Sequence, residues 1–209
     1  MLLAAYDNGT ATIERVDIVE TGRHGMYIIA TDAIITDSTV TGVRQVEDQG
    51  DEECYFVDRY GGIVLVEGTL DWQGGEVSEN GGYGFSNIRG SASVDDTYIG
   101  GNICAGFMNF GGSDILTGNT FTGASPGSLS ASVVEYGNTG SIISGNTFID
   151  NQNTEDTITV YDYSKYYDEK TCASNPGLCY TDTYTYIDKP DSVDIYITLE
   201  SSVEITGNT

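Results

Sequence analysis

A six-residue pattern, apolar at both ends and mostly small or polar in between, recurs along the chain. Its copies begin at Ile13, Ile35, Trp72, Val94, Leu116, Ile143 and Ile205. The offset is the same from Ile13 to Ile35, from Trp72 to Val94 and from Val94 to Leu116, and every other offset between successive copies is longer. Equal offsets interrupted by longer ones indicate one 22-residue structural repeat that carries insertions.

A glycine recurs at one fixed position of the repeat, and we call these glycines the glycine column. Each glycine lies ten residues before the next copy of the pattern and precedes a bulky apolar residue, as in Gly25-Met26, Gly62-Ile63, Gly84-Phe85 and Gly106-Phe107. Gly62 keeps this spacing only if the first insertion lies upstream of it, at about 46–60. The longest offset places a second excursion at about 161–192.

A repeat of this length suits three short strands and three turns, which predicts one coil of a right-handed parallel β-helix. The third position of the pattern is Gly or Asp in six copies, and both residues tolerate the positive φ of tight turns. The fourth position is polar in five copies: Ser38, Thr97, Asn119, Asn146 and Asn208. Stacked about 4.8 Å apart, these side chains are expected to form a hydrogen-bonded ladder. The closing apolar residues are expected to stack inside: Ile18, Val40, Val77, Ile99, Phe121 and Phe148.

The sequence therefore predicts an all-β protein, a single domain over 1–209 that forms a solenoid of about seven coils with two excursion loops. An antiparallel sandwich is the alternative, although it gives no reason for a constant phase. A solenoid needs polar caps at its open ends. Neither end shows one, and the last copy stops at Thr209, before its closing apolar residue. We therefore expect a segment of a longer solenoid, whose partners are neighbouring coils of that chain or end-to-end protomers.

Gly-Asn-Thr-Phe at 118–121 and 145–148, together with the glycine-aromatic strand starts, resembles the right-handed parallel β-helix repeat proteins. That superfamily includes pectate-lyase-like, polygalacturonase-like and carbohydrate-binding members. The resemblance covers most of 11–160 and 193–209. It implies the fold and is nearly silent on chemistry.

The net charge limits the kinds of molecule that the chain can bind. The chain has 32 acidic and 8 basic residues, a net charge of −24. Phosphates would be repelled, so unaided binding to nucleic acid or anionic lipid is not expected. The apolar runs are too short to insert into a membrane as a helix, and the first residues lack the features of a signal peptide.

The first excursion carries six acidic residues among its fifteen positions. Clustered carboxylates supply the hard oxygen ligands that Ca²⁺ prefers, although the spacing is not that of an EF-hand. A solvated loop is one interpretation and a calcium site the other; no other cofactor is expected. The calcium ligands would be Glu47, Asp48, Asp51, Glu52 and Glu53.

The second excursion is rich in tyrosine. Its rings either cover the flank of the solenoid or form a recognition surface, because tyrosine combines rigid apolar area with a hydroxyl that suits sugars and protein partners. The candidate ligand-binding residues are Tyr163, Tyr166, Tyr167, Tyr180, Tyr184 and Tyr186.

Cysteine placement favours an oxidising compartment. Cys172 and Cys179 flank an Asn-Pro-Gly turn, which predicts a local disulfide. Cys104 lies near the column at which the excursion containing Cys54 rejoins the repeat, so a second disulfide between these two is one alternative and two free thiols the other. Disulfides in an acidic, tyrosine-rich chain are typical of an extracellular or cell-surface protein.

Catalytic residues are scarce. His24 is the only histidine, and Arg23 and Arg44 are expected nearby in the repeat. Polysaccharide lyases of the resembled superfamily use basic residues on uronates, which implies a catalytic role for Arg23, His24 and Arg44; surface salt bridges to the acidic loop are the simpler interpretation. The sequence leaves catalysis undecided and favours a non-enzymatic scaffold, adhesin or glycan-binding module. A uronate lyase or epimerase is the alternative.

Overall fold

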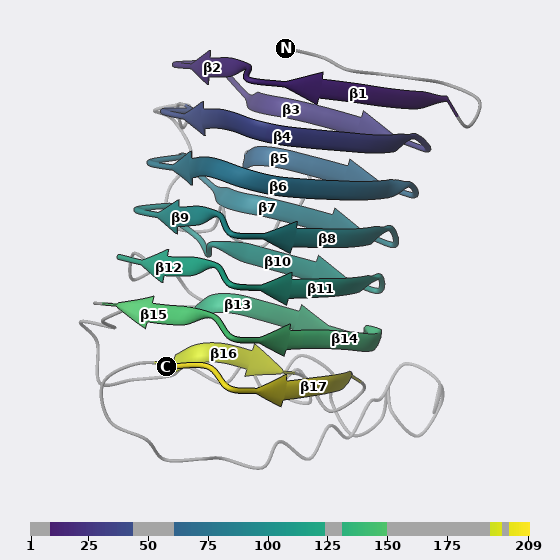
Figure 1. The fold of residues 1–209 in the computed structure, drawn as a ribbon, viewed down its shortest axis with the longest axis vertical. Helices are drawn as coiled ribbons and strands as arrows, with labels where there is room; N and C mark the ends of the chain where they lie inside the picture. Colours follow the sequence, from purple (N-terminus) through teal and green to yellow (C-terminus); the bar gives the residue numbers. More distant parts are fainter. Residues whose placement is uncertain (1–8, 44–60, 124–130, 150–192, 198–200) are drawn as a thin grey trace, which may run out of the picture.

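The chain of the computed structural model passes repeatedly between two facing sheets, whose strands run in opposite directions (Figure 1). The structure describes residues 9–43, 61–123, 131–149, 193–197 and 201–209. These residues form strands that pair only in parallel, in one eleven-stranded and one six-stranded sheet, and they contain no helix. The protein is therefore all-β with parallel sheets, as the sequence predicts, and the antiparallel sandwich is wrong. Within the same residues, no helix is long and apolar enough to cross a membrane.

The larger sheet holds the strands of the six-residue pattern and those just before it. Its strands are β1 Thr10–Glu14, β2 Asp17–Val19, β4 Asp32–Thr41, β6 Thr69–Ser78, β8 Ser91–Asp95, β9 Tyr98–Gly100, β11 Ser113–Thr117, β12 Thr120–Thr122, β14 Thr139–Ser144, β15 Thr147–Ile149 and β17 Ser202–Thr206. The smaller sheet holds the strands that follow the glycine column. They are β3 His24–Ile29, β5 Gly61–Val66, β7 Tyr83–Ile88, β10 Phe107–Phe110, β13 Ala131–Tyr136 and β16 Val193–Ile197.

Neighbouring strands come from successive repeats. The predicted interior column is in register from strand to strand, through Ile18, Val40, Val77, Ile99, Phe121 and Phe148. The residues after the glycine column are in register as well: Met26, Ile63, Phe85 and Phe107. Both predicted columns are confirmed.

The structure has three strands per repeat at β7, β8 and β9, but β4 and β6 each run unbroken through two of the expected strands. They stay paired on both sides of the turn position, and Ser38 lies opposite Gly75 directly after it. A Cβ on Gly75 would lie only 2.0 Å from the Ser38 carbonyl oxygen. The missing side chain therefore allows the two backbones to approach closely enough for the ladder to continue.

The turn position behaves as predicted. Asp37 and Asp96 have φ of 47° and 48°, and the glycines there have φ between 63° and 71°. These glycines are Gly74, Gly118, Gly145 and Gly207. The left-handed conformation bends each strand, which directs the closing apolar residue of the pattern back into the interior.

The predicted polar ladder is present at its three asparagines, whereas the Ser38 and Thr97 hydroxyls donate to the backbone carbonyls of Thr36 and Asp95 instead. The Asn119 amide Nδ2 donates to Asn146 Oδ1 at 3.0 Å, and Asn146 Nδ2 donates to Asn208 Oδ1 at 3.1 Å. A second ladder, which sequence analysis missed, joins Asn80 Nδ2 to Asn102 Oδ1 at 2.9 Å. All of these side chains except Asn208 are buried, so the ladders satisfy polar groups that water does not reach.

Large apolar side chains fill the space between the sheets. The Trp72 and Phe85 rings meet edge to face with centroids 5.5 Å apart, and Phe121 stacks on Phe148 at 5.1 Å. Trp72, Phe85 and Phe121 are at most 1% exposed. Because side chains alternate between the two faces of a strand, the polar residues between these positions face outward.

Candidate functional site

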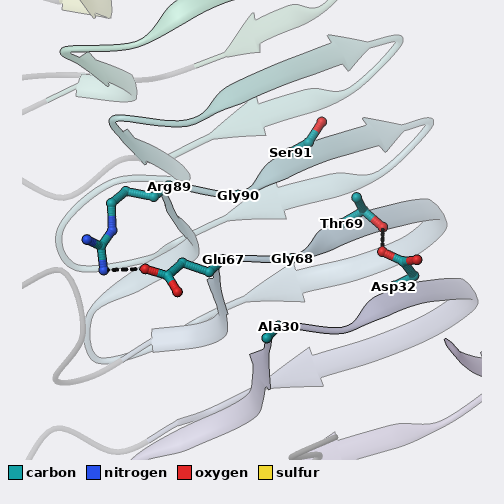
Figure 2. A pocket seen from close by; sticks show the side chains of 8 residues that line it. All are labelled: Ala30, Asp32, Glu67, Gly68, Thr69, Arg89, Gly90 and Ser91. Atoms are coloured by element: carbon teal, nitrogen blue, oxygen red, sulfur yellow. Dashed lines mark hydrogen bonds and ion pairs between the residues drawn. The ribbon is translucent and has the colours of Figure 1, made fainter. Parts of the chain in front are cut away.

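A shallow groove lies at the turn edge, where the chain leaves the smaller sheet and enters the larger one. It is lined by Ala30, Asp32, Glu67, Gly68, Thr69, Arg89, Gly90 and Ser91 (Figure 2). These residues come from three successive turns, β3–β4, β5–β6 and β7–β8, so equivalent positions lie one above another.

Backbone geometry builds this groove. Ala30, Glu67 and Arg89 take the left-handed conformation, with φ of 45°, 52° and 57°. Gly68 follows Glu67, and a Cβ there would lie 2.5 Å from the Thr31 carbonyl oxygen. The turns are therefore sharp, and the Glu67 and Arg89 side chains at two of them are exposed.

Polar side chains flank the turns. Arg89 Nη2 forms an ion pair with Glu67 Oε1 at 2.7 Å, and Thr69 Oγ1 donates to Asp32 Oδ1 at 2.6 Å (Figure 2). The Arg89 and Glu67 side chains are 62% and 55% exposed, so the pair adds little stability and stays open to a ligand. The groove presents both donors and acceptors.

Two exposed aromatic rings continue the same edge toward the C-terminus. Phe110 is in register with Ile88 of the preceding repeat and with Tyr136 of the next one. The Phe110 and Tyr136 rings are parallel within 5°, their centroids are 5.1 Å apart, and they are 41% and 49% exposed. We call the groove and these two rings the turn-edge surface. It combines exposed apolar area with hydrogen-bonding groups, the combination found where ligands with apolar and polar faces bind.

A second polar cluster is buried between the sheets. It consists of Asn109, Asp114, Glu135, Asn138 and Ser141, each at most 2% exposed. Asn109 Nδ2 donates to Asp114 Oδ1 at 2.5 Å and to Glu135 Oε2 at 3.1 Å. Asn138 Nδ2 donates to Glu135 Oε2 and to Ser141 Oγ, both at 2.5 Å, and Ser141 Oγ donates to Asp114 Oδ1. We call these five residues the buried acid cluster.

Burial dominates the electrostatics of the cluster. Loss of hydration raises the pKa of the Asp114 carboxyl above its usual range. Loss of hydration, and then the Asp114 charge, raise the pKa of Glu135 to about 9. Two carboxylates with so little access to water require a counter-charge or a proton.

Sequence analysis missed this cluster, although the repeat contained the signal. Asp114 is in register with Ala92, and Ala92 with Leu70, so an acid occupies an inward-facing column. Glu135 pairs with Asn109, in a column that also holds Leu65 and Asn87. Extending the 22-residue spacing from Leu70 through Ala92 would have placed Asp114 in this inward-facing column. Glu135 lies 26 residues after its partner Asn109, so the constant spacing does not reach it.

Most of the predicted site residues lie outside the described residues. These are Arg44, the calcium candidates Glu47, Asp48, Asp51, Glu52 and Glu53, and the tyrosines Tyr163, Tyr166, Tyr167, Tyr180, Tyr184 and Tyr186. Cys54, Cys172 and Cys179 lie outside as well. In the part of the chain that the structure describes, no group of three or more His, Cys, Asp or Glu residues is arranged to hold a metal ion.

Of the suggested catalytic group, the structure describes two members. Arg23 is exposed, and His24 is half-buried with its ring centroid 5.1 Å from that of Tyr27. His24 begins β3, whereas the groove lies just beyond the other end of that strand, at Ala30. The two basic residues and the turn-edge surface are therefore separate features.

The architecture defines an all-β protein with parallel, in-register sheets and an exposed polar and aromatic edge. No protein-family model, curated protein or solved structure matches the chain.

Proposed function

We propose that this chain is a right-handed parallel β-helix of an extracellular or cell-surface protein, and that it serves as a scaffold which binds glycans along the turn-edge surface. The 22-residue repeat supports the fold, because equivalent residues of successive repeats lie in register on parallel strands, as in Phe85 with Phe107 and Ile99 with Phe121. Repeats that contact only their neighbours form extended binding surfaces of this kind. The superfamily that the sequence resembles includes carbohydrate-binding members.

The observation that carries the binding function is the parallel Phe110–Tyr136 pair beside the polar groove. A sugar ring offers an apolar face to aromatic carbon and hydroxyls to polar groups, and both kinds of partner lie on this edge. With a net charge of −24, the chain favours neutral over acidic polysaccharides. The tyrosines of the second excursion remain candidates for the same ligand.

The cysteines support an oxidising, extracellular compartment. Cys104 is 1% exposed, and we infer that it forms a disulfide. A structural disulfide is typical of an oxidising environment. The pairing of Cys54 with Cys104 and that of Cys172 with Cys179 remain predictions, which peptide mapping of the unreduced protein would test.

We expect the double substitution Phe110→Ala and Tyr136→Ala to weaken glycan binding at least about tenfold, since truncating an aromatic anchor costs on the order of 1–2 kcal/mol. The measurement is binding of the full chain to arrays of neutral and uronate-containing polysaccharides, followed by titration of the best ligand.

Tyr98→Ala is the matched control, because Tyr98 is 44% exposed but lies on the outer face of the larger sheet. If the double variant and the control bind equally well, the turn-edge surface is not the binding site. Release of unsaturated uronate in the presence of Ca²⁺, abolished by Arg44→Ala, would instead favour the lyase alternative.

A further inference from the structure

The buried acid cluster contains more acceptors than donors. Asn109, Asn138 and Ser141 direct their N–H and O–H groups to one oxygen of each acid, Asp114 Oδ1 and Glu135 Oε2. The second carboxylate oxygens, Asp114 Oδ2 and Glu135 Oε1, are buried and have no hydrogen-bond partner within the described residues. An unpaired buried carboxylate oxygen is costly, so something that is positively charged or donates a proton must meet this pair.

Asn138 adds an independent observation. Its side chain is fully buried, and its amide nitrogen donates to Glu135 and Ser141, which fixes the amide inside the cluster. The amide oxygen, Asn138 Oδ1, is buried and has no partner in the described part of the chain.

A shared proton would not complete this cluster. The Asp114 and Glu135 carboxyls are hydrogen-bonded to each other. A proton between them joins at most one oxygen of each acid, and the Asn138 amide oxygen, as the amide is oriented, still lacks a donor. A cation attracts carboxylate and amide oxygens together, and a divalent cation balances two carboxylates. The three unpaired atoms, Asp114 Oδ2, Glu135 Oε1 and Asn138 Oδ1, are all oxygens. Oxygen is the ligand that a hard cation such as Ca²⁺ prefers.

We propose that Asp114, Glu135 and Asn138 form a buried site for one divalent hard cation, of the Ca²⁺ class, between the two sheets. The site is separate from the acidic excursion at about 46–60 and does not depend on glycan binding. Because its ligands are at most 2% exposed, the ion binds as the strands β11 and β13 come together and leaves only when they separate. Its role is structural: it ties the two sheets together.

The test is metal retention by the full-length chain. The protein is refolded with CaCl₂, dialysed against buffer treated to remove free calcium, and analysed for bound metal by atomic emission. We expect the wild-type chain to hold one calcium more than Glu135→Gln, and its melting temperature to rise by several degrees more with CaCl₂ than that of the variant. Asn138→Ala, which removes an oxygen but no charge, should also lower retention.

Asp71→Asn is the matched control. It removes one carboxylate from the outward face of the larger sheet and should retain calcium like the wild-type chain. Glu135→Gln removes a buried charge, so we expect it to fold, which circular dichroism checks; Asp114→Asn is the second variant. Equal calcium content in wild type and Glu135→Gln, or no thermal response of the wild-type chain to CaCl₂, would overturn the proposal.

Discussion

Gly75→Ala should destabilise the fold more than any of the other single substitutions. A Cβ at this position would lie 2.0 Å from the Ser38 carbonyl oxygen and 2.8 Å from the Ser38 amide nitrogen, and both are backbone atoms. The neighbouring strand has no freedom to withdraw, because β4 and β6 pair from Asp32–Thr69 to Thr41–Ser78. Overpacking against backbone, added to a φ of 85°, should cost at least about 3 kcal/mol, a large part of the stability of a typical domain.

Gly140→Ala is the control, because it introduces the same backbone strain as Gly75→Ala without the steric clash. Gly140 also has a φ of 85°, but no described atom lies within 4 Å of the added Cβ. We expect this variant to fold and to lose only the left-handed strain, about 1–2 kcal/mol. Urea unfolding of both variants gives the comparison. Equal losses would mean that close approach to Ser38 is not what selects glycine at position 75.

Asn119→Ala should give the second largest loss, because it breaks the ladder at its centre. Asn119 Nδ2 donates to the Val94 carbonyl at 2.8 Å and to Asn146 Oδ1 at 3.0 Å, while Asn119 Oδ1 accepts from the Thr97 amide at 3.0 Å. The substitution leaves two buried backbone groups without partners. Each such group costs about 1–3 kcal/mol, so the free energy of unfolding should fall by about 2–5 kcal/mol.

The control is Asn208→Ala, at the end of the same ladder. Asn208 makes equivalent bonds to Asn146 and to the Ile143 carbonyl, but it is only half-buried. Water can replace those bonds, so a loss of under about 1 kcal/mol is expected in urea unfolding. A loss for Asn119→Ala as small as that for Asn208→Ala would mean that the buried hydrogen bonds of the ladder do not stabilise the fold.

The periodic part of the fold was predictable because it is a one-dimensional property of the chain. The constant spacing of the repeat predicts that Val77, Ile99 and Phe121 are in register, and the structure confirms that register. The turn position was predictable for the same reason, since Asp37, Asp96 and the glycines there share a conformation that few residues tolerate.

The candidate sites were far less predictable. The turn-edge surface joins residues of different types, such as Thr69, Arg89 and Phe110, and only their positions along one edge relate them. The suggested roles of His24 and of the tyrosine-rich excursion came from residue type alone. Residue type does not indicate which side chains converge, because convergence depends on the path of the backbone.

Sequence by itself determined the repeat, the interior column and the ladder of Asn119, Asn146 and Asn208, because each residue in them needs only its equivalent in the next repeat. Tertiary structure alone decided which features face each other across the interior. Asp114 and Glu135 lie on different sheets, and they meet only because β11 and β13 enclose the same space. Their interaction depends on the distance between the two sheets, which no spacing along the chain encodes.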